Sequence, residues 1–290
     1  MARNPKYTVA SFSDAARPLA EQLNASFVRL RMSTYAAGER VAHVGARVRG
    51  SCFLVEDVGA DAESLLRVLL AANALMHSGA SSVSLVAPWM AYGRQDRPTH
   101  PQESVGGEVI GVLFRSIFRR IFTLDAHSPA FASLFGGRLV SCFPAGIAAD
   151  IASKHRATAI AAPDGGARDR ARAVSTILGL PLLVCQKSRS KPGRRGVSVR
   201  AVSGEPRGHR VLLIDDMVDS GGTLAEAAQM LKKYGAVSVG AVVTHAANPK
   251  RVPSAATLGL SLLTVLHPRI RARIPPQITD LLSVAVRQAR

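Results

Sequence analysis

A cluster of acids, glycines and hydroxyls follows one apolar run, in the stretch Val-Leu-Leu-Ile-Asp-Asp-Met-Val-Asp-Ser-Gly-Gly-Thr-Leu of residues 211–224. Glycines let backbone N–H groups converge on an anion, and a helix beginning at Thr223 adds its dipole and a hydroxyl. The segment therefore predicts a phosphate-binding turn. Asp215 and Asp216 cannot favour phosphate directly, so they must face sugar hydroxyls or a magnesium ion. A phosphorylated sugar satisfies both halves, whereas an ordinary helix cap leaves three aspartates within five residues unexplained.

The elements that must position this turn alternate along the chain. Short apolar runs bounded by Gly, Pro and Asp, each followed by helical periodicity, predict an α/β fold of mostly parallel strands flanked by helices. The expected strands are Cys52–Val55, Ser82–Ala87, Arg120–Leu124, Ala159–Ala162, Leu182–Cys185, Val211–Ile214 and Val237–Thr244. The expected helices are Ala62–Ser78, Ser104–Phe118, Pro144–Lys154, Arg168–Leu178 and Thr223–Tyr234.

Two segments of the chain resemble each other. Each has an apolar strand, an acidic pair, a helix and then Gly-Ala-x-Ser-Val; the acidic pairs are Glu56-Asp57 and Asp215-Asp216. This predicts two similar domains, residues 1–145 and 146–290, unless two α/β units of shared composition match by chance. Because only the second copy has a Gly-rich turn, we expect it to bind phosphate and the first to be scaffold or regulator.

The charge of the chain is its unusual bulk property. The 290 residues carry a formal net charge of +17, which requires an anionic partner or a role in solubility. Phosphorylated small molecules favour cations converging on a cleft, whereas nucleic acid favours a basic stripe or arm. The segment 186–210 concentrates eight Lys and Arg against the single acid Glu205.

Cysteine usage and hydropathy exclude several classes. The three cysteines, Cys52, Cys142 and Cys185, lie far apart, so a disulfide framework or zinc site is not expected. No apolar run is long enough to span a membrane, and the N-terminus has no apolar segment behind its charge. We therefore expect a cytoplasmic protein without a membrane partner.

The turn at residues 215–223 resembles the signature of the phosphoribosyltransferase superfamily, an apolar strand with two acids and an Asp-Ser/Thr-x-Gly-Thr loop that binds ribose 5-phosphate or its pyrophosphate. The resemblance by itself does not separate transferases that consume phosphoribosyl pyrophosphate from the kinase that makes it. It implies that the residues binding ribose 5-phosphate are Asp215, Asp216, Asp219, Ser220, Gly221, Gly222 and Thr223.

Three further segments resemble ribose-phosphate pyrophosphokinases. Residues 87–97, Ala-Pro-Trp-Met-Ala-Tyr-Gly-Arg-Gln-Asp-Arg, are similar to that family's ATP segment, and residues 123–128 to its Asp-Leu-His strand end, where histidine contacts magnesium and ATP phosphates. Residues 162–168, Ala-Pro-Asp-Gly-Gly-Ala-Arg, are similar to its pyrophosphate loop. The resemblance implies Mg²⁺ as cofactor, held near His127 and Asp164. It implies as ATP-binding residues Arg94, Gln95, Asp96, Arg97 and His127, where the arginines grip polyphosphate and Gln95 and Asp96 orient nucleotide or loop.

The basic segment also has a counterpart in that family, a Lys-x-Arg pair at the root of a flexible loop that closes over the transferring phosphates. Lys187 and Arg189 occupy this position, so the resemblance implies that they are the catalytic cations. The Gly, Pro, Ser and Arg content of residues 188–208 predicts a loop that is mobile until anionic substrates order it. The alternative is a disordered basic linker that binds nucleic acid.

Three departures from the family pattern bear on regulation and assembly. The adenine motif Phe-x-Asp-Gly-Glu, supplied by a neighbouring subunit, occurs as residues 35–39, where Tyr35 and Glu39 keep the pattern and Ala37 replaces the acid. Residues 98–105 differ from the bacterial regulatory loop, which argues against inhibition by ADP at a separate site. The tail 281–290 is short and basic where the family has a longer apolar helix, so oligomer contacts are expected to differ.

Together these features predict an enzyme that transfers the β,γ-diphosphoryl group of ATP to the 1-hydroxyl of ribose 5-phosphate, giving phosphoribosyl pyrophosphate and AMP. The expected partners are the two substrates and further copies of the chain in a homo-oligomer. The alternatives are a regulatory or nucleic-acid-binding relative on the same fold and a salvage phosphoribosyltransferase. The first is less favoured because the double Asp, His127 and the Lys-x-Arg pair are all present.

Overall fold

The computed structural model describes residues 7–189, 197–267 and 274–289, with the side chains of residues 187–200 outside that description. The chain forms two compact units: unit 1 is Met1–Cys142 with Arg269–Arg290, and unit 2 is Phe143–Pro268. The first boundary therefore falls between Cys142 and Phe143, close to the expected one. The C-terminal segment differs from the expectation, because it belongs to unit 1 and not to unit 2.

The return of the C-terminus to unit 1 has a simple packing cause. Helix α8 (Pro276–Gln288) packs on helix α1 (Arg17–Gln22) and on the sheet of unit 1. Its buried side chains Ile278, Leu282 and Val286 recur at helical spacing, so one face of the helix is apolar and must be covered. Asp280 and Arg287 add hydrogen bonds to Gln22 at the end of α1.

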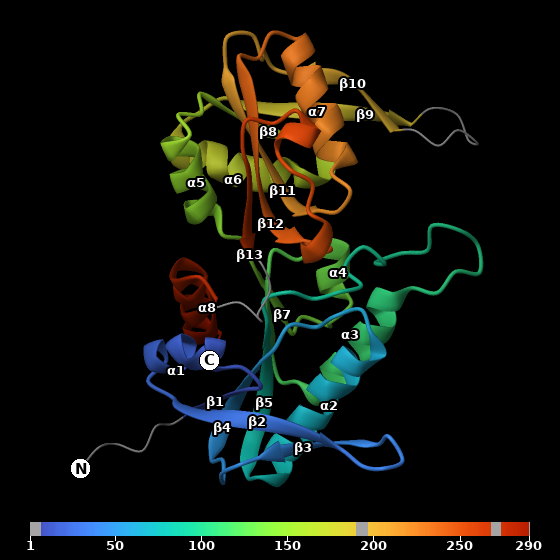
Figure 1. The fold of residues 1–290 in the computed structure, drawn as a ribbon, viewed down its shortest axis with the longest axis vertical. Coiled ribbons are helices and arrows are strands. Elements are labelled where there is room, and N and C mark those ends of the chain that lie inside the picture. The colour runs from blue at the N-terminus through green and yellow to red at the C-terminus, as the bar shows by residue number, and fades with distance from the viewer. Residues whose placement is uncertain (1–6, 190–196, 268–273, 290) are drawn as a thin grey trace. The chain divides into compact units, whose positions relative to one another are not determined.

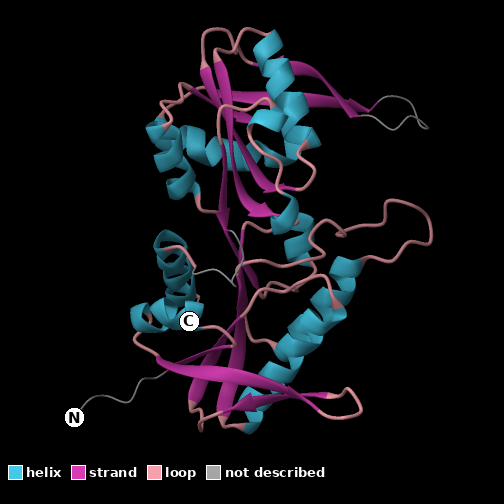
Figure 2. Cartoon of the chain, in the orientation of Figure 1, coloured by secondary structure: helices cyan, strands magenta, loops and turns pink. Residues whose placement is uncertain are grey.

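Unit 1 is built on a seven-stranded sheet in the order β3-β2-β1-β4-β5-β6-β7. All neighbouring strands are parallel except β3, which pairs antiparallel with β2. The strands are β1 (Tyr7–Ser11), β2 (Ser26–Thr34), β3 (Arg40–Val44), β4 (Gly50–Val55), β5 (Ala80–Ala87), β6 (Ile121–Leu124) and β7 (Leu139–Cys142). The remaining helices are α2 (Ala62–His77), α3 (Gly106–Ile117) and α4 (Pro129–Ser133). Figure 2 shows α2 and α3 on one side of this sheet and α1 and α8 on the other.

Unit 2 is built on a six-stranded sheet in the order β10-β9-β8-β11-β12-β13. Only β10 is antiparallel to its neighbour. The strands are β8 (Ala159–Ala162), β9 (Leu182–Arg189), β10 (Val197–Ser203), β11 (Arg210–Val218), β12 (Ser238–Ala246) and β13 (Leu263–His267). Helix α7 (Gly222–Lys233) covers one face, and helices α5 (Ala145–Lys154) and α6 (Arg168–Leu178) cover the other (Figure 1).

The burial of the central strands explains why they read as continuous apolar runs. Residues 211–214 of β11 and 159–162 of β8 are fully buried, since helices cover both faces of a parallel sheet. Parallel strands end at the same edge, so the segments that follow β8 and β11 lie side by side there.

The α/β fold of two mostly parallel, helix-flanked sheets is confirmed. The expected strands and helices all occur, with ends shifted by a few residues. Part of the expected mobile loop is a strand instead, because β10 pairs antiparallel with β9, Val199 opposite Lys187. None of the helices in the described ranges has the length and apolar character needed to span a bilayer.

Candidate active site

The predicted phosphate turn lies between β11 and α7 of unit 2. Gly221 takes a φ of +79°, which is left-handed and favours glycine, and a Cβ there would stand 2.6 Å from Leu258 Cδ2. At Gly222 a Cβ would meet nothing nearer than Ser220 Oγ at 3.8 Å. The N-cap residue of α7 is Gly221, which has no side chain to cap the helix. The first turn of the helix can therefore present its backbone N–H groups to an anion.

Asp215 and Asp216 lie near the end of β11, beside the turn. Asp216 is 5% exposed, and its N–H donates a hydrogen bond of 2.9 Å to Asp215 Oδ1. Burial raises the pKa of Asp215 well above its usual range, and the nearby charges of Asp216 and Asp164 raise it further. The carboxylates of Asp164, Asp215 and Asp216 thus lie close together. The sequence analysis predicted Asp215 and Asp216 as sugar-binding residues and Asp164 as a metal ligand.

Asp164 reaches this cluster from the turn that follows β8. Its Oδ1 accepts hydrogen bonds from the N–H groups of Gly166 at 2.9 Å and Ala167 at 3.3 Å, so it caps the 3₁₀ turn Gly165–Ala167 that leads into α6. Gly165 and Gly166 are exposed, and a Cβ on Gly165 would meet nothing within 4 Å. The loop is open to a ligand on the side of the glycines.

The predicted ATP segment follows β5 in unit 1 and is anchored by Asp96. The carboxylate of Asp96 accepts hydrogen bonds from Arg97 Nε at 2.8 Å and Nη2 at 3.1 Å, and also from Ser128 Oγ. Hydrogen bonds from Arg97 and then Ser128 lower the pKa of Asp96 to about 2, against the effect of burial. The Asp96 side chain is 6% exposed and that of Arg97 is 68% exposed. Asp96 therefore orients the loop, and Arg97 faces outward.

His127 lies against the same segment. It follows β6, and a Cβ on Gly93 would stand 3.2 Å from His127 Cβ. The N–H of Gly107, in the first turn of α3, donates a hydrogen bond of 2.9 Å to the carbonyl oxygen of Gln95. The structure thus places His127 beside the segment Arg94–Arg97, although the two are far apart in the sequence.

The remaining predicted residues lie elsewhere. Tyr35 and Glu39 form the tip of the β2–β3 hairpin, where the N–H of Tyr35 donates to the carbonyl oxygen of Glu39 at 2.7 Å and the Tyr35 ring is 62% exposed. Within the described residues no hydrogen bond joins either side chain to the Arg94–Arg97 segment. Lys187 and Arg189 lie on β9, and their side chains are outside the described part of the structure.

Glu56 and Asp57, the acidic pair of the first copy, make contacts within unit 1. Glu56 is 7% exposed and forms an ion pair with Arg67 of α2 at 3.0 Å. Asp57 accepts a hydrogen bond of 2.8 Å from the N–H of Trp89, at the start of the ATP segment. The two acids hold a helix and a loop of unit 1 in place.

The carboxylates of unit 2 fit a magnesium ion held partly by ligands other than protein. In the described part of the chain no three His, Cys, Asp or Glu side chains converge as a complete metal site. Magnesium, however, is usually bound through one or two carboxylates with waters and substrate phosphates. Burial and the nearby charges of Asp216 and Asp164 raise the pKa of Asp215, and a divalent cation beside Asp164 would relieve the repulsion among these carboxylates.

Comparison with known proteins supplies the family. Residues 7–117 match the family model of the N-terminal domain of ribose phosphate pyrophosphokinase, and residues 145–259 match the phosphoribosyl transferase domain. The ribose-phosphate pyrophosphokinase of Wolinella succinogenes is 32% identical over 244 residues, covering 81% of this chain and 78% of that protein. The ribose-phosphate pyrophosphokinase of Agrobacterium fabrum is 32% identical over 236 residues, covering 79% of this chain and 76% of that protein. The chain belongs to the ribose-phosphate pyrophosphokinase family.

The fold of the family is also seen in a solved structure. The phosphoribosylpyrophosphate synthetase of Mycobacterium smegmatis matches with a TM-score of 0.80 over 98% of both chains, at 23% sequence identity. At that identity the match concerns the fold. It covers both units, each of which carries one of the two matched family domains.

Two supporting residues of the site were not predicted from the sequence. Ser128 donates to Asp96 and also caps α4, accepting a hydrogen bond of 3.0 Å from the N–H of Phe131. The dipeptide Ser128-Pro129 is a helix-start signal that indicates the cap. Asp57 supports Trp89, and nothing in the sequence indicated that contact.

Proposed function

We propose that this member of the ribose-phosphate pyrophosphokinase family makes phosphoribosyl pyrophosphate and AMP from ribose 5-phosphate and ATP. The observation that carries the proposal is that one chain holds both groups: the Arg94–Arg97 segment with His127 against it in unit 1, and the phosphate turn with its acidic cluster in unit 2. A salvage phosphoribosyltransferase does not need the arginines and His127 of unit 1. A regulator does not need the phosphate turn and acidic cluster of unit 2.

Ribose 5-phosphate binds on unit 2. Its phosphate sits on the backbone N–H groups and hydroxyls of residues 220–223, and its ring hydroxyls donate to the carboxylates of Asp215 and Asp216. The left-handed conformation at Gly221 shapes this turn, and the low exposure of Asp216 fixes the direction of one carboxylate. The sugar is therefore held at both ends, which orients its 1-hydroxyl.

ATP binds on unit 1. Arg97, held by Asp96, and Arg94 grip the phosphate oxygens, with His127 alongside. Gln95 contacts the nucleotide through its side chain, which the exposed loop leaves accessible. Asp96 acts by orienting the loop.

In the transfer, the oxygen of the sugar 1-hydroxyl forms a bond to the β-phosphorus and the bond from that phosphorus to the α-phosphate oxygen breaks. AMP leaves, and the hydroxyl proton passes to solvent. Such reactions have loose transition states, so positioning and charge stabilisation dominate. Lys187 and Arg189 supply the cations that neutralise the developing charge. Asp164 and His127 would be the ligands of magnesium, which would withdraw charge from the phosphate oxygens.

The hairpin tip with Tyr35 and Glu39 binds adenine in a neighbouring copy of the chain, so the active enzyme is a homo-oligomer. An aromatic ring that is 62% exposed at a hairpin tip is suited to insertion into a second chain. Because Ala37 replaces the acid of the family motif, we expect weaker discrimination between adenine and other bases.

The deciding experiment incubates the purified chain with ATP, ribose 5-phosphate and Mg²⁺ and identifies the products. Equimolar AMP and 1-diphosphorylated ribose 5-phosphate are expected. Formation of ADP and ribose 1,5-bisphosphate would contradict diphosphoryl transfer. Formation of a nucleotide from a free nucleobase and phosphoribosyl pyrophosphate would instead support a salvage transferase.

A further inference from the structure

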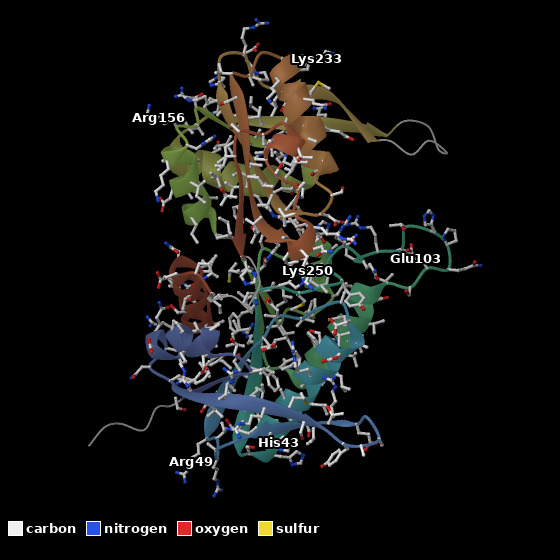
Figure 3. The ribbon with its side chains drawn as sticks, viewed as in Figure 1. His43, Arg49, Glu103, Arg156, Lys233 and Lys250 are labelled. Carbon is white, nitrogen blue, oxygen red and sulfur yellow. The ribbon has the colours of Figure 1, made fainter. Side chains whose placement is uncertain are left out.

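One edge of unit 2 concentrates positive charge that the proposed reaction does not use. Five exposed cations lie on or next to the three loops that precede β8, β11 and β12: Lys154 at the end of α5, Arg156, Arg207, Arg210 at the start of β11, and Lys233 at the end of α7. We call these cations, with Tyr234, the basic edge. None of the five takes part in an ion pair among the described residues. Figure 3 shows Arg156 and Lys233 extending outward at the same end of unit 2.

Hydrogen bonds join the three loops into one surface. Arg210 Nε donates to the carbonyl oxygen of Arg156 at 2.8 Å, and the N–H of Thr158 donates to the carbonyl oxygen of Arg210 at 2.8 Å. The N–H of Gly208 donates to the carbonyl oxygen of Gly235 at 3.0 Å. The strands β8, β11 and β12 are neighbours in the sheet. The backbone segments that carry the cations are therefore joined to one another and are not independent loops.

The basic edge lies away from the proposed ribose 5-phosphate site. It is at the amino ends of the strands, whereas Asp164 and the phosphate turn follow their carboxyl ends. Strand β11 runs from Arg210 to Val218, so at roughly 3.3 Å per residue its two ends are about 26 Å apart. Beyond about 10 Å, salt at physiological strength screens exposed charges. These cations therefore do not stabilise the proposed transition state.

Helix stability explains only part of this charge. Lys154 and Lys233 lie in the last turns of α5 and α7, where cations interact favourably with the helix dipole. Arg156, Arg207 and Arg210 lie outside these helices. Arg156 also takes a φ of +52° just after α5, a left-handed position where glycine is usually preferred.

An aromatic ring stands among the cations. Tyr234 follows Lys233 at the end of α7 and is 43% exposed. The stem of Arg207 lies against the next residue, since a Cβ on Gly235 would be 3.2 Å from Arg207 Cγ. Val237 adds further exposed apolar surface at 67%. An exposed ring with cations on the neighbouring segments is an arrangement that stacks an unpaired base while the cations contact the phosphates beside it.

We propose that the basic edge of unit 2 binds single-stranded nucleic acid, with Tyr234 stacking on a base and the five cations contacting the backbone. The acids nearest the edge are Asp150, one turn before Lys154, and Glu205, which accepts a hydrogen bond of 2.9 Å from the N–H of Arg207. They leave the edge with an excess of positive charge. A duplex has no unpaired base for Tyr234, which is why a single strand is the favoured occupant.

The first test measures salt-dependent binding of the full chain to a fluorescein-labelled single-stranded oligonucleotide by anisotropy. The edge variant combines Arg156→Gly, Arg207→Gln and Lys233→Gln. In a plot of log K against log salt concentration, each phosphate contact to a single strand contributes a slope of roughly −0.7. The variant lacks three cations, so its slope should be less steep than that of the parent by about 2. Its affinity at low salt should fall at least about ten-fold. The Arg156→Gly change should leave the melting temperature unchanged or raise it, because glycine relieves the left-handed backbone.

A charge-matched control separates a site from the general effect of +17. Arg31→Gln, Arg47→Gln and Arg49→Gln remove three exposed cations from unit 1 (Figure 3 labels Arg49). This control should keep nearly the parent slope and affinity. Equal losses in the two triple variants would overturn the proposal, since binding would then depend on net charge alone. Both variants should form phosphoribosyl pyrophosphate at the parent rate.

The second test addresses the aromatic ring. Tyr234→Ala should weaken binding of the single strand about ten-fold without changing the salt slope, while Tyr234→Phe should bind like the parent. The parent should prefer the single strand over a duplex of the same sequence. An unchanged affinity in Tyr234→Ala, or binding of vesicles containing phosphatidylserine with no binding of the oligonucleotide, would refute the proposal.

Discussion

The carboxylate of Asp96 is bonded on one side to the Arg97 guanidinium, with Nε at 2.8 Å and Nη2 at 3.1 Å, and on the other to the hydroxyl of Ser128. One acid thus links the loop after β5 to the segment that carries His127. These hydrogen bonds lower the pKa of Asp96 to about 2, so the group is ionised throughout the neutral range. The link fixes where an outward-facing arginine can meet a phosphate.

Replacing Asp96 by Asn keeps its shape and removes its charge. Asp96 holds the Arg97 guanidinium by two charge-assisted hydrogen bonds, so loss of this orienting group should raise the KM for ATP about ten-fold. The KM for ribose 5-phosphate should stay the same. Initial rates with each substrate varied in turn measure the difference.

Asp14→Asn is the matched control for Asp96. Asp14 also pairs with arginines, Arg17 and Arg29, both at 2.9 Å, but lies on a different part of unit 1. It should change neither the KM for ATP nor the KM for ribose 5-phosphate.

The stability that Asp96 contributes is present above the usual pKa of Asp, near 3.8, and is lost as the pH falls through about 2. Any change of activity between pH 6 and 9 must therefore come from another group.

Asp215 predicts a gain in stability on neutralisation. Its pKa is raised by burial and by Asp216 and Asp164, so the native protein binds more protons than the unfolded chain, and stability falls as the pH rises above the usual Asp range. In the presence of a chelator, Asp215→Asn should melt at a higher temperature than the parent at pH 7. The difference should shrink as the pH is lowered, because the parent carboxyl is then protonated.

The activity of Asp215→Asn should move in the opposite direction. Loss of an ionised acceptor for the sugar hydroxyls should reduce kcat/KM for ribose 5-phosphate about ten-fold or more. Asp219→Asn, at an exposed position just beyond β11, serves as the control for stability and should leave the melting temperature unchanged. A lower melting temperature for Asp215→Asn in the chelator would contradict the repulsion described above.

The two glycines of the phosphate turn should behave differently when each is replaced by alanine. At Gly221, a positive φ of +79° and the overlap with Leu258 and Pro253 should cost about 2 kcal/mol or more of unfolding free energy. At Gly222, the first residue of α7, there is room for a Cβ, and alanine should be neutral or stabilising by up to about 1 kcal/mol. Urea unfolding measures both.

The same pair separates folding from binding. The added methyl at Gly222 lies at the start of the helix, where the proposed phosphate sits, so the KM for ribose 5-phosphate should rise although the fold is intact. The KM for ATP should not change. If Gly222→Ala bound ribose 5-phosphate as the parent does, the turn would not hold the phosphate.

The central elements of the fold were predictable because local signals and burial agree there. Helix α2 begins after Asp61, whose Oδ1 accepts a hydrogen bond of 2.7 Å from the N–H of Ser64, and the strand before it is buried on both faces. The edge strands and β2, which lies next to the edge strand β3, were not predicted. In β2 only Leu30 is buried, so the stretch lacks an apolar run, and its pairing with β3 is set by contacts across the sheet.

The candidate site divides in the same way. The turn at residues 215–223 was predicted with its chemistry because strand, acids, glycines and helix start follow one another in the sequence. The contacts of Asp96 with Ser128 and of Gly93 with His127 join residues that are more than thirty positions apart. The motifs indicated which residues to expect, but no local pattern encodes how they meet. The roles assigned to Lys187 and Arg189 stay predictions from the motif.

Lys187 is the residue whose removal should affect turnover most. If its ammonium neutralises charge that develops only in the transition state, Lys187→Ala should lower kcat by about 10²–10³-fold and change the KM of either substrate little. Lys187→Arg keeps the charge with a different geometry and should recover part of the loss. Arg207→Gln removes a cation near the far end of the same basic segment and should keep the parent kcat. A Lys187→Ala enzyme with a raised KM and unchanged kcat would show that this side chain binds substrate in the ground state, and the transition-state charge would then have to be assigned to Arg189.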